Sequence, residues 1–176
     1  MRFIETGLSG CLRVALEPRG DERGFFSRTF CAASFAAQGL ETDFVQHSIS
    51  FSKERGTLRG MHFQRPPHAE AKLVRCLRGE IFDVVIDLRV GSSTQGRWIG
   101  VKLSAENFEQ LYIPKGFAHG FQTLSPDCLI DYRISTAYAP EAGCGVRWND
   151  PAFAIDWPLV PTVMNDKDQS WPDFQG

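Results

Sequence analysis

Short runs of alternating apolar and polar residues, separated by turn residues, recur along the chain and limit the folds open to it. They lie at residues 11–17, 23–30, 44–52, 57–64, 71–77, 80–88, 98–103, 111–114, 116–124 and 129–135. Side chains alternate between the two faces of a strand, so each run is typical of a strand with one buried face. About ten short strands at this spacing predict an all-β sandwich or barrel.

Two segments depart from the alternating pattern. Residues 32–38 are small and apolar and are followed by Gly39, which predicts one short helix. After Pro140 the alternation fades, and tryptophans lie among prolines and acidic residues. We expect this irregular C-terminal segment to lie over the barrel, and residues 1–176 to form a single domain.

Composition argues against several kinds of partner and location. The 176 residues carry a net charge of −2 with scattered basic residues, so we expect no nucleic acid partner. No apolar run approaches the ~20 residues of a membrane-spanning helix, so we expect no membrane partner. Five cysteines without C-x-x-C spacing, and an amino terminus without a long apolar stretch, predict reduced thiols in a cytoplasmic protein.

The stretch from residue 56 to 79 brings charged side chains into two predicted strands. Strict alternation places His62 on the same face as Leu58, toward the interior, and Arg59 on the opposite face. In the next strand Lys72 lies on the apolar, inward face. The sequence therefore predicts a histidine and a lysine inside one small barrel.

A metal site is one interpretation of these residues. Cupin-type barrels bind metal through a G-x5-H-x-H…E motif and a later P-x-G-x-x-H motif, and Gly56, His62 and His119 fit that frame. Gln64 occupies the place of the second histidine, and Glu70 lies beyond the usual spacing. A transition metal needs about three or four ligands with good geometry. We therefore expect the barrel without the metal.

Acid–base chemistry is the other interpretation. Burying an unmatched ammonium costs several kcal/mol, so the inward Lys72 indicates a function. A histidine such as His62 takes a proton near neutral pH, and Tyr132, in a later strand, can give one. A lysine can stabilise a developing oxyanion. Asp168 is a candidate to orient the imidazole, with a surface turn residue as the alternative; a hydrogen-bonded core role is the alternative for His62.

Anion binding is the third feature of the sequence. Arg23 and Arg59 each precede a glycine, where a ligand can approach the backbone closely. Either alone is typical of a solvated turn charge. Together with an inward lysine and histidine they predict a phosphate clamp. Phe26 and Tyr138 are candidates to stack on a base, with core packing as the alternative.

These motifs resemble those of the dTDP-4-dehydrorhamnose 3,5-epimerase family of nucleotide-sugar enzymes. The resemblance runs through DERGFF at 21–26, TLRGMHFQ at 57–64, KLVRCLRGEIFDVVIDLR at 72–89, IPKGFAHGFQTLS at 113–125, WNDP at 148–151 and DKD at 166–168. It implies a cupin-type jelly-roll barrel, a homodimer, and no metal or organic cofactor. The implied reaction is epimerisation at C3, with C5 as a second candidate, of a nucleoside-diphosphate 4-keto-6-deoxy sugar, first of all dTDP-4-dehydro-6-deoxyglucose, in the biosynthesis of rhamnose-like deoxysugars.

The resemblance also implies roles for individual residues. His62 is similar to the base that removes the proton next to the C4 ketone, and Asp168 to its dyad partner. Lys72 is similar to the residue that stabilises the enolate oxygen, and Tyr132 to the acid on the opposite face. The residues implied to contact nucleotide, diphosphate or sugar are Arg23, Phe26, Gln46, Ser48, Arg59, His119 and Tyr138.

Two positions differ from the pattern of the family. Ser48 stands where asparagine is common, and Arg28 stands where glutamate is common. The rival hypothesis is a non-catalytic sugar-nucleotide-binding cupin or a weak metal-dependent cupin enzyme. The joint presence of a base, an acid, an oxyanion stabiliser and an orienting carboxylate favours the epimerase, because a binding module needs no such set.

Overall fold

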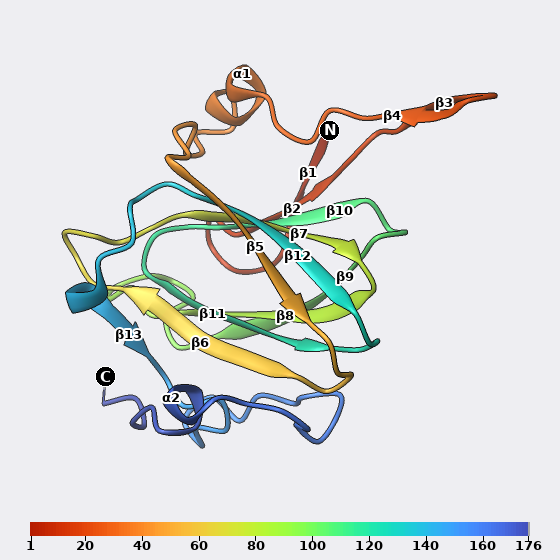
Figure 1. The fold of residues 1–176 in the computed structure, drawn as a ribbon. Coiled ribbons are helices and arrows are strands. Elements are labelled where there is room, and N and C mark those ends of the chain that lie inside the picture. Colours follow the sequence, from red (N-terminus) through yellow and green to blue (C-terminus); the bar gives the residue numbers. More distant parts are fainter. Residues whose placement is uncertain (176) are drawn as a thin grey trace.

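The computed structural model describes residues 1–175 and confirms an all-β jelly-roll architecture of two stacked sheets (Figure 1). The larger sheet has the strand order β1 (Arg2–Glu5), β2 (Leu12–Ala15), β10 (Glu109–Ile113), β7 (Lys72–Arg78), β12 (Cys128–Ile134), β5 (Gln46–Ser52). The smaller sheet has the order β13 (Gly143–Gly145), β6 (Leu58–Gln64), β11 (Phe117–Thr123), β8 (Glu80–Asp87), β9 (Trp98–Ser104).

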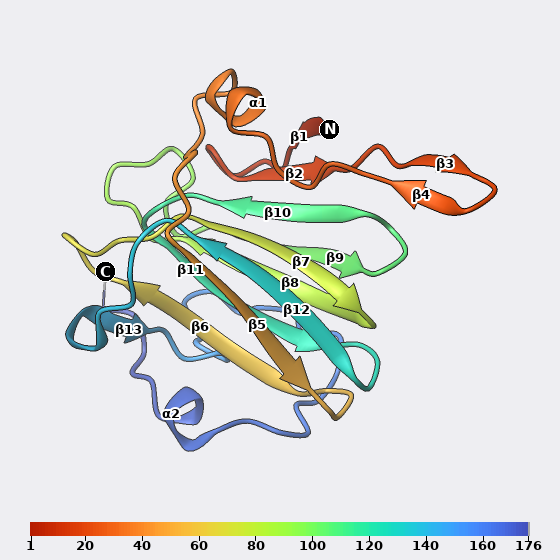
Figure 2. The ribbon, with the colours of Figure 1, turned by 45° about the horizontal axis from the view of Figure 1, so that its top comes forward.

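The remaining elements lie outside the two sheets. Strands β3 (Arg19–Asp21) and β4 (Gly24–Phe26) form a separate hairpin that projects from the body (Figure 2). The helical segments are α1 (Ala32–Ala36), the 3₁₀ turn η1 (Pro140–Ala142) and the single-turn α2 (Asp166–Gln169). Within residues 1–175, none of the helices has the length and apolar character needed to cross a bilayer.

Strand β8 is apolar on both faces because both faces are covered. Ile81 and Val85 pack into the core between the two sheets. Val84 and Ile86, on the other face, pack with Phe153 of the C-terminal segment. A strand buried on both sides has a nearly continuous apolar sequence, as in EIFDVVID. The prediction that the C-terminal segment lies over the barrel is thus confirmed (Figure 1).

Helix α1 confirms the predicted helix and packs on the outer face of the larger sheet. Its side chain Phe35 is fully buried. The Phe35 ring makes edge contacts with Phe3 on β1 and Tyr112 on β10, at centroid distances of 5.3 and 6.1 Å. One aromatic side chain therefore fastens a helix of only five residues to the sheet.

The structure corrects three expectations about strands. Strand β1 falls outside the predicted runs, and within residues 23–30 only β4 is a strand. Strict alternation was also wrong for Arg59, which lines the same cavity as His62. The pairing of β6 with β11 shifts register between His119 and Phe121, and a bulge of this kind changes the face to which the following side chains point.

Replacement of Phe35 by alanine should lower the free energy of unfolding by ~3–5 kcal/mol, because it leaves a cavity where an aromatic ring was buried. Urea unfolding followed by circular dichroism measures this change. Val90→Ala is the control, since Val90 is exposed and the effect should stay within about 0.5 kcal/mol. Equal effects of the two substitutions would contradict the anchoring role of Phe35.

Candidate active site

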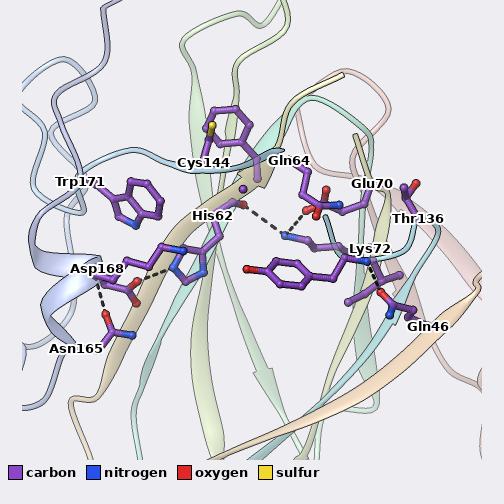
Figure 3. Close-up of a pocket in the computed structure, with 15 residues that line it drawn as sticks. Gln46, His62, Gln64, Glu70, Lys72, Thr136, Cys144, Asn165, Asp168 and Trp171 are labelled. Carbon is purple, nitrogen blue, oxygen red and sulfur yellow. Dashed lines mark hydrogen bonds and ion pairs between the residues drawn. The ribbon is translucent and has the colours of Figure 1, made fainter. Parts of the chain in front are cut away.

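Two neighbouring cavities of about 310 and 320 Å³ share His62, Lys72 and Ile134 in their walls. Their side chains come from β6, β7 and β12, and α2 closes one side of the first cavity. Figure 3 shows the residues of the first cavity converging on its centre. A pocket in two parts can hold a ligand in two parts, with polar groups fixing its orientation.

His62 forms a dyad with Asp168 of the C-terminal segment. The imidazole Nε2 lies 2.7 Å from Oδ1 of Asp168 (Figure 3), and the backbone N–H of Gly60 donates to Oδ2 at 3.1 Å. Asn165 caps α2 by accepting the Asp168 N–H at 2.6 Å. The Asp168 side chain is 2 % exposed and the His62 side chain 43 %, so the carboxylate is fixed while the imidazole reaches the cavity.

Burial by itself would raise the pKa of Asp168, but the hydrogen bonds from the His62 ring and the Gly60 N–H outweigh it and hold this pKa below its ordinary value. The carboxyl group is therefore ionised at neutral pH. An ionised, buried carboxylate orients an imidazole and stabilises the imidazolium that forms when the ring takes a proton. The pair has the properties of a general base.

Lys72 enters the cavity from β7, as predicted. Its Nζ lies 3.1 Å from Oε1 of Glu70 and donates to the backbone carbonyl of His62 at 3.4 Å. The Lys72 and Glu70 side chains are 12 % and 7 % exposed. The sequence suggested Glu70 only as a displaced metal ligand; the structure shows it as the partner of the buried ammonium.

Tyr132 and His119 line the second cavity together with Ser48, Arg59 and His62. The rings of Tyr132 and His119 meet edge to face at 6.2 Å, and His119 Nε2 lies 2.7 Å from Oδ1 of the buried Asp83. Burial raises the pKa of Tyr132, and the negative charge of Asp83 adds to this effect. The phenol thus keeps its proton at neutral pH and can act as a donor.

Three further residues complete the walls. Gln46 and Tyr138 line the first cavity, and the Gln46 Oε1 accepts the Tyr138 N–H at 2.7 Å. Trp171, which no sequence motif indicates, lies edge to face against the His62 ring at 6.3 Å. Its only signal in the sequence is its position close to Asp168 in an irregular segment.

Arg23 and Phe26 do not reach these cavities within one copy of the chain. Both lie on the projecting β3–β4 hairpin (Figure 2), where they are exposed. Arg23 pairs with Asp21 on the same hairpin, with 2.5 Å between Nη2 and Oδ2. Their predicted contact with a ligand therefore requires a surface other than the cavity walls of their own copy.

Gln64 occupies the position of the second histidine in the cupin motif, and its side chain hydrogen-bonds to the backbone. Its Nε2 donates to the carbonyls of His68 and Ala137 at 2.9 and 3.3 Å, and its Oε1 accepts the Ala139 N–H at 2.7 Å. Nowhere in residues 1–175 do three His, Cys, Asp or Glu side chains form a metal-binding cluster. The donor set around His62 thus does not match that of a cupin metal centre.

Comparison with known proteins shows the family to which the chain belongs. The family model described as dTDP-4-dehydrorhamnose 3,5-epimerase matches residues 5–176. The enzyme of that name from Methanothermobacter thermautotrophicus is 49 % identical over 173 residues, covering 97 % of this chain and 92 % of that protein.

Solved structures extend the comparison to three dimensions. The dTDP-4-dehydrorhamnose 3,5-epimerase of Elizabethkingia anophelis has a TM-score of 0.95 at 41 % identity, covering 99 % of this chain and 96 % of its own. A dTDP-6-deoxy-D-glucose-3,5-epimerase of Legionella pneumophila, solved with dTDP-4-keto-L-rhamnose, has a TM-score of 0.90 at 39 % identity and 99 % coverage of both chains. The chain belongs to the dTDP-4-dehydrorhamnose 3,5-epimerase family.

Proposed function

We propose that this protein epimerises dTDP-4-dehydro-6-deoxyglucose at C3, with C5 as a second centre, in deoxysugar biosynthesis. The observation that carries the proposal is that His62, Lys72 and Tyr132 line one cavity while Asp168 supports His62 from outside it. Base, oxyanion stabiliser and acid are the groups needed to move a proton beside a ketone. Membership of an isomerase family, and the keto sugar bound by the Legionella relative, support the choice of substrate.

In this mechanism the His62–Asp168 dyad removes the proton from the carbon next to the C4 ketone. The electron pair of the broken C–H bond forms an enolate, whose charge collects on O4. The Lys72 ammonium stabilises that oxyanion. The Tyr132 hydroxyl then gives its proton to the same carbon from the opposite face, which inverts the centre. To reset the site, His62 releases its extra proton to solvent and the Tyr132 phenolate takes one up.

The ligand contacts form the second part of the proposal. Gln46, Ser48, Arg59, His119 and Tyr138 would hold the sugar and the nucleotide, because all five line the two cavities. Arg59 donates from Nε to Ser52 Oγ at 3.1 Å and from one Nη to the Phe51 carbonyl at 3.0 Å, so its orientation is fixed before a ligand arrives. A fixed guanidinium is well suited to a diphosphate.

Arg23 and Phe26 enter the proposal through a homodimer. The hairpin that carries them extends away from its own barrel (Figure 2). Its Phe25 and Phe26 are exposed. In a two-fold dimer a projecting arm of one copy can reach the pocket of the other. We infer that each pocket receives Arg23 and Phe26 from the partner.

The five free thiols are in keeping with a cytoplasmic location.

His62→Ala should lower the exchange of the C3 proton with deuterated water by ~10²–10⁴, the usual effect of losing a general base. Asp168→Asn should cause a smaller loss, because the imidazole remains but is held poorly. NMR of the dTDP-sugar measures exchange at C3 and C5 separately and so counts the centres. His68→Ala is the matched control, since this half-exposed histidine lies outside both cavities. Wild-type exchange in His62→Ala would refute the assignment.

Tyr132→Phe should separate proton removal from inversion. The enolate still forms with His62 and Lys72 intact, but reprotonation then comes mainly from His62 on the original face. The variant should therefore exchange its C3 proton while returning mostly uninverted sugar, and the ratio of exchange to inversion by NMR should rise. Tyr112→Phe, outside both cavities, should keep the wild-type ratio. An unchanged ratio in Tyr132→Phe would remove Tyr132 from the mechanism.

Mixing two inactive variants tests the shared site. The double variant Arg23→Ala/Phe26→Ala lacks the two side chains that the hairpin would contribute, and His62→Ala lacks the base. After the subunits are mixed and exchanged, each heterodimer contains one pocket with both an intact arm and an intact base. Random pairing should thus restore about one quarter of the wild-type rate. No recovery, or full activity of the arm variant alone, would contradict a pocket built from two copies.

A further inference from the structure

Glu70 lies next to Lys72 in the first cavity (Figure 3), and the mechanism above does not use it. Its Oε1 pairs with the Lys72 ammonium at 3.1 Å, while its Oε2 is buried and has no hydrogen-bond partner among residues 1–175. A buried carboxylate oxygen without a donor is unfavourable. The side chain is kept in this position at a cost to stability, which points to a role in the site.

The backbone on both sides of Glu70 is fixed to the end of strand β12. The Ala71 N–H donates to Ser135 Oγ at 2.8 Å, and the Ser135 N–H donates to the Ala71 carbonyl at 3.0 Å. Thr136 Oγ1 donates to the Ala69 carbonyl at 3.0 Å. Glu70 is therefore held by the two residues that directly follow the strand carrying Tyr132, so its backbone has a defined position relative to the proposed acid.

Glu70 also limits the orientations of the Lys72 side chain. An ammonium has three N–H donors on a flexible four-carbon stem. One faces Glu70 Oε1, and one makes the long, 3.4 Å contact with the His62 carbonyl. The third N–H remains for a ligand. Without Glu70 only the long contact would hold the ammonium, and its direction would be poorly defined.

We propose that Glu70 is a positioning residue that directs the Lys72 ammonium at the C4 carbonyl oxygen of the substrate. This inference rests on the proposed function. The carboxylate also offsets the charge of Lys72, so this end of the cavity suits an uncharged sugar ring better than a diphosphate. Arg59, which within the described part of the chain bonds to Ser52 and the Phe51 carbonyl and to no carboxylate, then provides the anion-binding end.

A double-mutant cycle between Glu70 and Lys72 tests the inference, with C3 proton exchange as the readout. Glu70→Met should lower kcat ~10-fold or more with little change in KM, since oxyanion stabilisation acts on the transition state. Glu70→Gln should lose less kcat than Glu70→Met, because its amide oxygen can still accept from Lys72. In the Lys72→Met background, Glu70→Met should cause no further loss, because the group that it positions is gone.

A thermal measurement, a fallback variant and a matched control separate positioning from folding. The thermal midpoint of Glu70→Met/Lys72→Met should be close to wild type, because removing both charges leaves neither one buried alone. Glu70→Asn, too short to reach Lys72, replaces Glu70→Met in the cycle should the latter not fold. Glu80→Met is the matched control, since it breaks the surface pair with Lys102 (2.9 Å) and should leave kcat unchanged.

The outcomes distinguish this inference from the proposed function. A wild-type protein that exchanges no sugar proton refutes the function itself. If the wild type exchanges the sugar proton and Glu70→Met leaves kcat unaffected, only the positioning role is refuted. An equal loss from Glu70→Met in the presence and absence of the Lys72 ammonium also refutes it, because Glu70 would then act independently of Lys72.

Discussion

The hydrogen bond between His62 and Asp168 is the contact on which the whole site depends. It joins strand β6 to a one-turn helix 106 residues later and closes one side of the cavity with the C-terminal segment. The same carboxylate also accepts the Gly60 N–H, so the strand, the helix and the base are fixed together. Without this bond the imidazole would lose its orientation, and the segment would lose one of its attachments beside the cavity.

The other polar groups of the site follow the same rule of paired burial. Lys72 is buried with Glu70, and His119 with Asp83. Burying a polar or charged group is costly unless it is matched, so each of these buried groups has a partner. The paired groups are thereby fixed before a substrate arrives. A fixed dipole or charge stabilises a transition state better than one that must first reorient.

Much of the fold could be predicted from the local pattern of apolar and polar residues. Alternation located most of the strands, and the small apolar run before Gly39 gave the helix α1. The inward direction of Lys72 followed from its place in an apolar strand. Local pattern failed for Arg59, because a register shift against a neighbouring strand cannot be seen in the strand's own residues. It also failed for β1, a short strand at the edge of the larger sheet.

The sequence by itself determined the fold class, the family and the residue types of the chemistry, because hydrophobic alternation and ordered motifs are properties of the chain read along its length. Only the tertiary structure decided which residues meet. It made Glu70 the partner of Lys72, placed Arg59 in the same cavity as His62, and separated Arg23 from the cavity walls of its own copy. Such contacts depend on the pairing of strands and the packing of loops far apart along the chain, which no local pattern encodes.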